Sequence, residues 1–325
     1  MTKKNFTIKQ AFMEQLDKRS AMPFDEFVQI VLYHPALGYY RLKHERVGKN
    51  NKSDFYTSNS IGAPWGEMIV EASAKILNLA NIKDYTFVEI GAEPNCSILD
   101  GFDHPFESTL SLRLDDPLEI PPKSIVFSNE WLDAQPFKRF RFDSKIQKWN
   151  EIGVSLIRGE FKESELSTNH SFSFPKDATD QYTIDWSTGA NHSLNQLVSK
   201  KWKGLFLTFD YGLSKQILFK ERPNGTARSY SKHKMNADLF SCPGEKDLTC
   251  HLCWDELIDC LTKGGFEKTK LQTQESFFMH HSQNSIKKIL SETGDLTNLK
   301  LQKLKELIHP QFFGSKFQAL WGVRN

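Results

Sequence analysis

Two acidic residues, three positions apart, are the first candidates for chemistry in this chain of 325 residues. Glu130 and Asp133 lie in the stretch SNEWLDAQPF, directly after the apolar run 125–127. Carboxylates placed this way in a turn can hold a cationic substrate. Two structural alternatives remain open, because Asp133 could cap the following helix and Glu130 could pair with Arg139 or Arg141.

The apolar run before these acids predicts a buried parallel strand. Open α/β sheets bind ligands at the carboxyl ends of their strands, so Asn129 and the acids would emerge where a ligand binds. A second buried strand, predicted at 204–209, ends in Asp210. If the two strands are neighbours, Asp210 is a third candidate acid, and Asn129 is a candidate for contacting a cofactor or substrate.

A possible nucleotide-binding turn follows the strand predicted at 86–91, TFVEIG. In doubly wound sheets this turn is rich in glycine because the backbone must approach the nucleotide closely. Gly91 is present here, but Glu93 and Asn95 stand where further glycines are expected. Glu89 and Gly91 are therefore the candidates from this turn for cofactor binding.

The spacing after this turn predicts a shortened sheet. Only 38 positions separate Gly91 from Asn129, and they hold one further strand candidate, 109–114. A single βαβ unit takes about 30 residues, so one strand with its helix is predicted to be missing. Either 109–114 is the second strand, with Asp115 or Asp116 as the acid that binds ribose, or it is the third and that acid is absent.

Hydroxyl side chains precede the helix predicted at 64–79. Thr57, Ser58 and Ser60 lie in the stretch DFYTSNSIG, residues 54–62. At a helix N-terminus they could cradle a carboxylate or a phosphate, because the free N–H groups there attract anions. Capping of the helix alone is the alternative.

The composition argues against several classes of function. Lys and Arg number 42 against 40 Asp and Glu, and this net charge of +2 argues against a general nucleic-acid binder. No apolar run reaches the roughly 18 residues of a membrane helix, and the first twenty residues lack an apolar signal region. The five cysteines are expected as reduced thiols in the cytoplasm. Cys250 and Cys253 have no second pair at zinc-finger spacing, so no metal is predicted.

Apolar periodicity predicts the remaining elements. The polar segment 159–183 is expected to be a loop. Helices are predicted at 8–16, 23–32, 194–203, 254–262, 285–290 and 299–308, and strands at 139–151, 154–158, 266–271, 277–280 and 312–323.

Several short motifs in a fixed order carry a family resemblance. They are YHPALGYY, DFYTSNSIG, WGEMI, SNEWLDAQPF, FDYG, GTARSY and PGEKDLT. Over residues 20–325 the chain resembles the MidA family of class I methyltransferases, whose mitochondrial members methylate protein arginine during assembly of respiratory complex I. The resemblance implies an α/β fold with a Rossmann-like sheet. It also implies an N-terminal helical cap (1–82) and a methyltransferase domain (83–325) with a substrate-facing insertion around 213–255.

The resemblance implies S-adenosylmethionine as cofactor and a protein as substrate or partner. Paired carboxylates suit a guanidinium, which stays protonated and offers a fork of N–H donors. The catalytic residues implied are Glu130, Asp133 and Asp210, and the cofactor-binding residues implied are Thr57, Ser58, Glu89, Gly91 and Asn129.

The chain departs from the family at the first turn, which has the form E-x-G-x-G-x-G. A carboxylate at Glu93 would face the methionine carboxylate of the cofactor, and like charges disfavour binding. Two functions are therefore expected: a cytoplasmic arginine methyltransferase, or a degenerate member that keeps the fold and serves as a protein-binding or assembly factor.

Overall fold

A computed structural model describes residues 6–42, 62–92, 96–167, 170–231, 234–292 and 298–325. The chain divides into two compact units. The first unit comprises residues 1–56, 133–192 and 213–253, and the second unit comprises 57–132, 193–212 and 254–325. Helix α4 (Thr188–Ser199) and strand β10 (Gly212–Leu213) carry the chain from one unit to the other. The predicted boundary after residue 82 stays a prediction.

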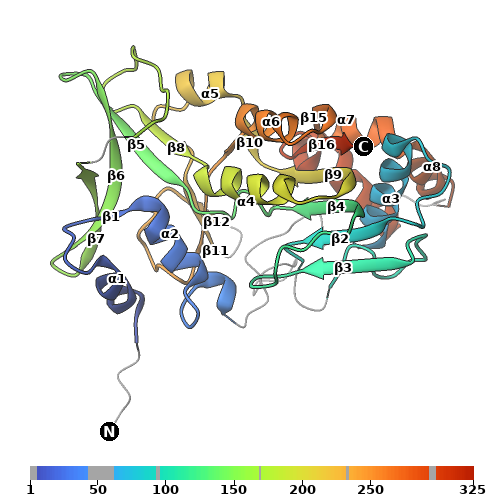
Figure 1. The fold of residues 1–325 in the computed structure, drawn as a ribbon, viewed down its shortest axis with the longest axis horizontal. Coiled ribbons are helices and arrows are strands. Elements are labelled where there is room, and N and C mark those ends of the chain that lie inside the picture. Colours follow the sequence, from blue (N-terminus) through green and yellow to red (C-terminus); the bar gives the residue numbers. More distant parts are fainter. Residues whose placement is uncertain (1–5, 43–61, 93–95, 168–169, 232–233, 293–297) are drawn as a thin grey trace, which may run out of the picture. The chain divides into compact units, whose positions relative to one another are not determined.

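A six-stranded sheet forms the second unit, in the order β15-β16-β9-β4-β2-β3. Four of its strands are parallel: β2 (Thr86–Ile90), β3 (Ser108–Leu112), β4 (Lys123–Asn129) and β9 (Lys203–Asp210). Figure 1 shows these four strands one beside the next. At one edge β16 (Gln318–Arg324) pairs antiparallel with β9, and β15 (Glu267–Thr273) pairs antiparallel with β16.

The order of the sheet decides between the two alternatives for the strand after β2. In the doubly wound order 3-2-1-4-5, the strand beside the first strand and opposite the fourth is the second. Strand β3 pairs directly with β2 at this position. It is therefore the second strand, and the third is the one missing from the described sheet. Between β2 and β3 the described residues also form no helix.

Aromatic side chains fill the core of the second unit. Trp65 of α3 (Ala63–Leu77) packs edge-on against Phe209 at a ring distance of 4.9 Å. Phe209 stacks on Phe278 at 5.5 Å. The other helices of this unit are α6 (Trp254–Lys263), α7 (Gln274–His281), α8 (Gln283–Glu292), α9 (Leu299–Ile308) and a π-helical turn, Pro310–Gly314.

One glycine lets the segment between β2 and β3 approach α3 closely. A Cβ placed on Gly66 would lie 2.1 Å from the carbonyl oxygen of Ile98. Ile98, Leu99 and Phe106 are buried in the same core as α3. The segment therefore covers part of the sheet with its own apolar side chains.

An antiparallel sheet forms the larger part of the first unit, in the order β1-β6-β5-β8, and β7 pairs with β6 off this path. A second sheet has the order β12-β11-β13. The strands are β1 (Met22–Pro23), β5 (Lys138–Asp143), β6 (Lys148–Ile157), β7 (Glu160–Leu166), β8 (Thr183–Trp186), β11 (Arg228–Ser231), β12 (Lys234–Asn236), β13 (Asp247–Thr249) and β14 (Leu252–Cys253). The helices are α1 (Ile8–Leu16), α2 (Phe24–Tyr33), α5 (Lys215–Lys220) and a 3-10 turn, Tyr39–Arg41.

Three predicted elements are corrected by the structure. The segment expected to be a loop at 159–183 contains β7, whose seven residues pair with β6. The strand expected at 139–151 is two strands, β5 and the start of β6, joined by a tight turn. Residues 277–280 lie in α7, so β15 pairs with β16 instead.

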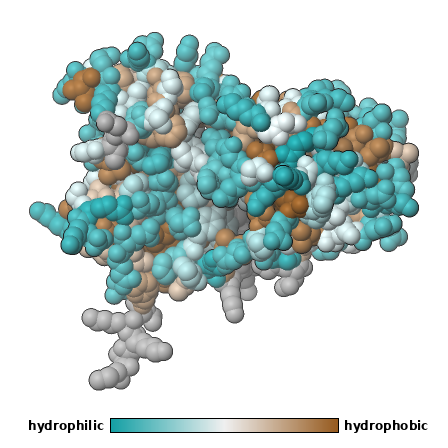
Figure 2. Space-filling view, in the orientation of Figure 1, coloured by the Kyte–Doolittle hydropathy of each residue, from teal (hydrophilic) through white to brown (hydrophobic). Residues whose placement is uncertain are grey.

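Hydrophilic side chains predominate on the face in Figure 2, with apolar ones interspersed. Ile146 and Met235 are the most exposed of the large apolar residues, each at 61%. Within the described segments, no helix combines the length and apolar character needed to cross a membrane.

Candidate active site

The carboxyl end of β4 places Asn129 and Glu130 together. Asn129 is only 8% exposed, and its Nδ2 donates to Glu130 Oε1 at 3.0 Å. Its Oδ1 is buried and accepts no hydrogen bond from the described part of the chain. The Tyr211 hydroxyl donates to Glu130 Oε2 at 3.4 Å. Glu130 has φ +50°, a left-handed backbone that is uncommon for residues other than glycine.

Asp210 braces the turn that carries these residues. It is fully buried at the end of β9. Its Oδ2 accepts the backbone N–H of Leu132 at 3.0 Å, and its Oδ1 accepts the backbone N–H of Tyr211 at 2.8 Å. The prediction that these two strands are neighbours is confirmed, because β4 pairs with β9. These two bonds give Asp210 a positioning role, and a catalytic role for it stays a prediction.

Asp133 belongs to the first unit, whereas Glu130 belongs to the second. The action of these two acids as a pair therefore stays a prediction. Asp133 is 7% exposed, and its Oδ2 accepts the Thr249 hydroxyl at 3.0 Å. Arg139 and Arg141, the alternative partners considered for Glu130, form ion pairs with Glu163, and Arg139 also pairs with Asp185.

Two tyrosines accompany a second buried acid in the first unit. Asp247 is 6% exposed, and its Oδ1 accepts the Tyr40 hydroxyl at 3.2 Å. Tyr33 stacks on Tyr40 at 5.4 Å and donates to the carbonyl oxygen of Ala134. Burial, and then the charge of Asp247, raises the pKa of both tyrosines, so both stay protonated. The sequence motifs YHPALGYY and PGEKDLT pointed to this region, but Asp247 itself was missed.

The carboxyl end of β2 uses its acid internally. Glu89 is 3% exposed, and its Oε2 accepts the Ser97 hydroxyl at 2.6 Å and the backbone N–H of Ile98 at 3.1 Å. Burial raises the pKa of Glu89. Gly91 has φ +76°, and a Cβ placed on it would lie 3.5 Å from Cβ of Trp131. Trp131 therefore packs against Gly91. This contact was not predicted from the sequence.

Asp115 and Asp116 directly follow β3. If β3 is the second strand of the fold, one of them is at the position of the acid that binds ribose. Asp115 and Asp116 are both exposed. Asp116 Oδ2 accepts the backbone N–H of Arg113 at 2.8 Å, and Asp115 has φ +76°. Thr57 and Ser58, the predicted hydroxyl cradle, lie outside the described residues.

Comparison with known proteins adds three findings. A family described as "Putative S-adenosyl-L-methionine-dependent methyltransferase" matches residues 85–272, more than half of the chain. No curated protein sequence matches. Two crystal structures from Burkholderia thailandensis share the fold at 18% identity. The one bound to S-adenosyl-homocysteine has a TM-score of 0.82, covering 98% of this chain and 92% of that one. The other, a native structure, has a TM-score of 0.79, covering 98% and 91%.

Proposed function

The chain belongs to this family of S-adenosyl-L-methionine-dependent methyltransferases, and we propose that it methylates an arginine side chain of a partner protein. The observation that carries the proposal is the orphaned Asn129 Oδ1 beside the Glu130 carboxylate at the carboxyl end of β4. Ligands of open α/β sheets bind at this edge. A buried acceptor without a partner among the described residues can accept a hydrogen bond from a ligand.

The residues at this edge fit the cofactor. S-adenosylmethionine carries N–H donors, and when bound it supplies an electrophilic methyl group on a cationic sulfonium. Asn129 Oδ1 would accept one of those N–H groups, and the Glu130 carboxylate would offset positive charge. Strands β2 and β4 pair in register through Ile90 and Ser128, so Gly91 follows directly beside Asn129. The backbone of Gly91 has no side chain to hold a ligand away.

The substrate side rests on carboxylates. A guanidinium stays protonated and must be held and oriented for its nitrogen to attack a methyl group, which is mainly a task of positioning. Glu130 and Asp133, the two acids predicted from the sequence, are the ones proposed for it. The resemblance to the MidA family supports arginine of a partner protein as the target. An odd number of cysteines, five, favours reduced thiols and supports the proposal of a cytoplasmic location.

A second function is favoured by the end of β2. The oxygens of Glu89 already hold Ser97 and Ile98, and Trp131 packs over Gly91. A turn used in this way binds a cofactor less well than a glycine-rich turn does. The alternative proposal is a degenerate member that retains the fold and acts as a protein-binding or assembly factor.

Calorimetric titration with S-adenosylmethionine separates the two functions. We expect saturable binding for the enzyme, and Asn129→Leu should weaken it about tenfold, since a hydrogen bond to a charged group contributes about 1.5 kcal/mol. Asn284→Leu, at an exposed asparagine of the same unit, is the matched control. The absence of both heat and a thermal shift at millimolar ligand would reject the methyltransferase in favour of the binding factor.

The target residue needs a separate test. Cell extract incubated with the protein and isotopically labelled cofactor should yield labelled methylarginine, identified by mass spectrometry. Glu130→Gln should reduce this transfer at least tenfold without changing the thermal midpoint. Label found only on another residue type would refute arginine, and unchanged transfer in Glu130→Gln would remove Glu130 from the proposed role.

A further inference from the structure

In the first unit, the backbone of the GTARSY stretch (225–230) binds the carboxylate of Asp185. Asp185 is 1% exposed, and its Oδ2 accepts the backbone N–H groups of Thr226 at 2.6 Å and Ala227 at 2.7 Å. Its Oδ1 pairs with Arg139 at 2.6 Å. Gly225 has φ +72°, and a Cβ there would lie 2.3 Å from the same carboxylate, so only glycine fits. Asp185 thereby fixes the backbone of this turn.

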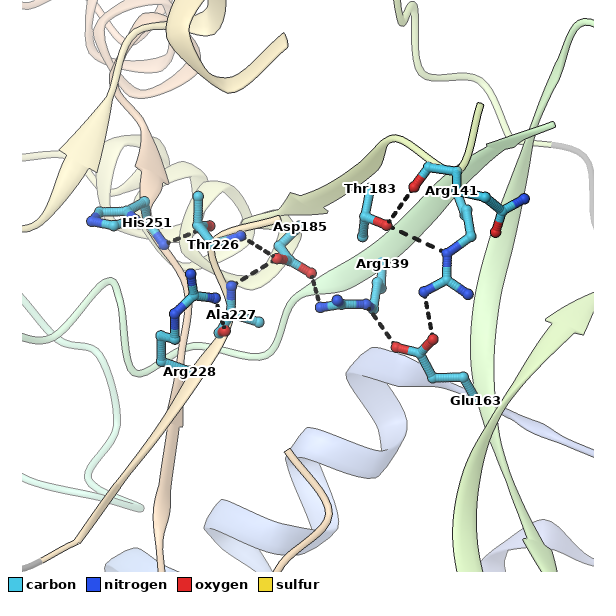
Figure 3. Close-up of polar contacts among 10 residues, drawn as sticks. Arg139, Arg141, Glu163, Thr183, Asp185, Thr226, Ala227, Arg228 and His251 are labelled. Atoms are coloured by element: carbon cyan, nitrogen blue, oxygen red, sulfur yellow. Dashed lines mark hydrogen bonds and ion pairs between the residues drawn. The ribbon is translucent and has the colours of Figure 1, made fainter. Parts of the chain in front are cut away.

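Among four arginines of the first unit, Arg139, Arg141, Arg222 and Arg228, two form ion pairs with carboxylates of the described residues. Arg139 and Arg141 pair with Glu163, and Arg139 pairs with Asp185 as well. Figure 3 shows these pairs together, whereas Arg228 lies apart from them on the side of Thr226 and His251. Neither Arg228 nor Arg222 makes an ion pair with a carboxylate of the described residues. Their guanidinium groups donate to the carbonyl oxygens of Ala227 and Glu221, respectively.

Arg222 and Arg228 flank Thr226 in the sequence, and Thr226 contacts the backbone of one histidine, His251. Arg228 pairs with Thr249 across β11 and β13. The same register continued by two residues sets Thr226 opposite His251, and the His251 N–H donates to Thr226 Oγ1 at 3.1 Å. Diagonal neighbours in such a ladder lie within reach of long side chains. Arg222 begins the turn that Gly225 closes, with the Gly225 N–H donating to its carbonyl at 3.0 Å.

His251 has an unused polar atom at this point. Its Nδ1 is buried and makes no hydrogen bond to any described residue. Burial first, and then the charges of Arg222 and Arg228, lower the pKa of His251 to about 4, while Asp185 acts in the opposite direction. The ring is therefore neutral at pH 7. The charges of both arginines thus act on the same ring.

We propose that Arg222, Arg228 and His251 form a binding site for an oxyanion, either a phosphate or a carboxylate group. Guanidinium groups are the preferred partners of both anions because their N–H donors match two oxygens at once. Arg222 is exposed and Arg228 is partly exposed, so an anion can reach them from solvent. The site consists of residues other than the proposed methyl-transfer residues, and its test does not require cofactor binding.

Inorganic phosphate is the first probe. Titration of the full chain at pH 7 should show saturable binding, and Arg222→Gln should weaken it about tenfold, as expected for a lost charge-assisted hydrogen bond. Because Arg222 is exposed, this variant is expected to fold. Arg158→Gln, at an exposed arginine in the turn after β6, is the matched control and should bind as the wild type does. Equal weakening in both variants, or no saturation, would overturn the proposal.

The imidazole signal of His251 gives an independent measurement. Its NMR resonance is assigned by its loss in His251→Gln. Phosphate should raise the pKa of His251, because a bound anion favours the charged ring, and Arg222→Gln without ligand should raise it too. A pKa that responds to neither change would contradict the site.

Two peptides identify the source of the anion. One carries a phosphoserine, and the other carries glutamate at the same position. Stronger displacement of phosphate by the phosphopeptide assigns a phosphate ester as the ligand, and the reverse order assigns a carboxylate. Failure of both peptides to displace phosphate at millimolar concentration would overturn the oxyanion site as a place for a protein ligand.

Discussion

Strands β2 and β4 are neighbours and end at the same edge of the sheet, yet their ends do different work. The carboxylate of Glu89, in β2, accepts hydrogen bonds from Ser97 and Ile98. The amide of β4, Asn129, keeps a buried acceptor that no described group fills. The first end holds the chain together, and the second end is the one proposed to bind the cofactor.

The difference comes from where each turn finds its support. The turn after β4 is braced from the next strand, because Asp210 of β9 accepts the N–H groups of Leu132 and Tyr211. The segment after β2 has no crossover helix among its described residues, and Glu89 anchors it instead. A side chain can bind a ligand only if another group does the structural work.

The largest effect is expected from Asp210→Ala. It would orphan two backbone N–H groups and should cost about 3 kcal/mol of unfolding free energy. Urea unfolding should show a lower midpoint with an unchanged slope. Asp210→Asn, which retains one carbonyl oxygen, should lose less. A loss below about 1 kcal/mol in Asp210→Ala would show that the β4 turn does not depend on this brace.

Glu89→Ala should follow at about 2 kcal/mol, since the Ser97 hydroxyl and the Ile98 N–H would lose their acceptor. Glu89→Gln should keep most of the stability and bind S-adenosylmethionine as the wild type does. A tenfold lower cofactor affinity in Glu89→Gln would instead show that the end of β2 also contributes to cofactor binding. That result would support the cofactor-binding role predicted for Glu89 from the sequence.

Gly91→Ala should cost about 1 kcal/mol, because an alanine at φ +76° adopts a left-handed backbone. The added Cβ would meet Trp131 at an ordinary contact distance, so no clash adds to that cost. Thermal unfolding measures the stability, and calorimetry measures the cofactor affinity. A much larger loss of stability would mean that Trp131 cannot accommodate even one methyl group.

The smallest effect is a pH dependence from Glu89. Its pKa in the folded protein lies above the ordinary value of 4.5 because of burial. The contribution of Glu89 to the free energy of unfolding is therefore fully present below about pH 4.5. It is lost as the pH rises through the pKa of Glu89 in the folded protein. As the pH rises from 4 to 7, the unfolding free energy of the wild type should therefore fall relative to that of Glu89→Gln. No change in that difference from pH 4 to 7 would contradict a raised pKa.

The sequence predicted most of the second unit because its signals are local. The apolar runs of β4 and β9 and the polar residues that end them were readable without the structure. The second-strand assignment of β3 was not, since it depends on pairing with β2. Residues 277–280 were expected as a strand, yet Phe277 and Phe278 are both buried in a helix between other aromatic rings. Tertiary packing decided that segment.

The first unit was harder to predict because its polar contacts join distant residues. Asp185 meets Thr226 and Ala227 some forty positions away, and Asp133 meets Thr249 at a separation of 116. Neither partner can be chosen from spacing alone. The motifs GTARSY and PGEKDLT marked these places, but their chemistry became readable only from the contacts.

The close approach at Gly66 suggests how this sheet tolerates a deletion. With Cβ absent, α3 admits the Ile98 carbonyl against its backbone, and Ile98, Leu99 and Phe106 enter the core. A short irregular segment thus supplies the apolar cover that a crossover helix gives in a longer chain. This close packing is possible because Gly66 has no side chain, and a bulkier residue at this position would push the segment away from α3.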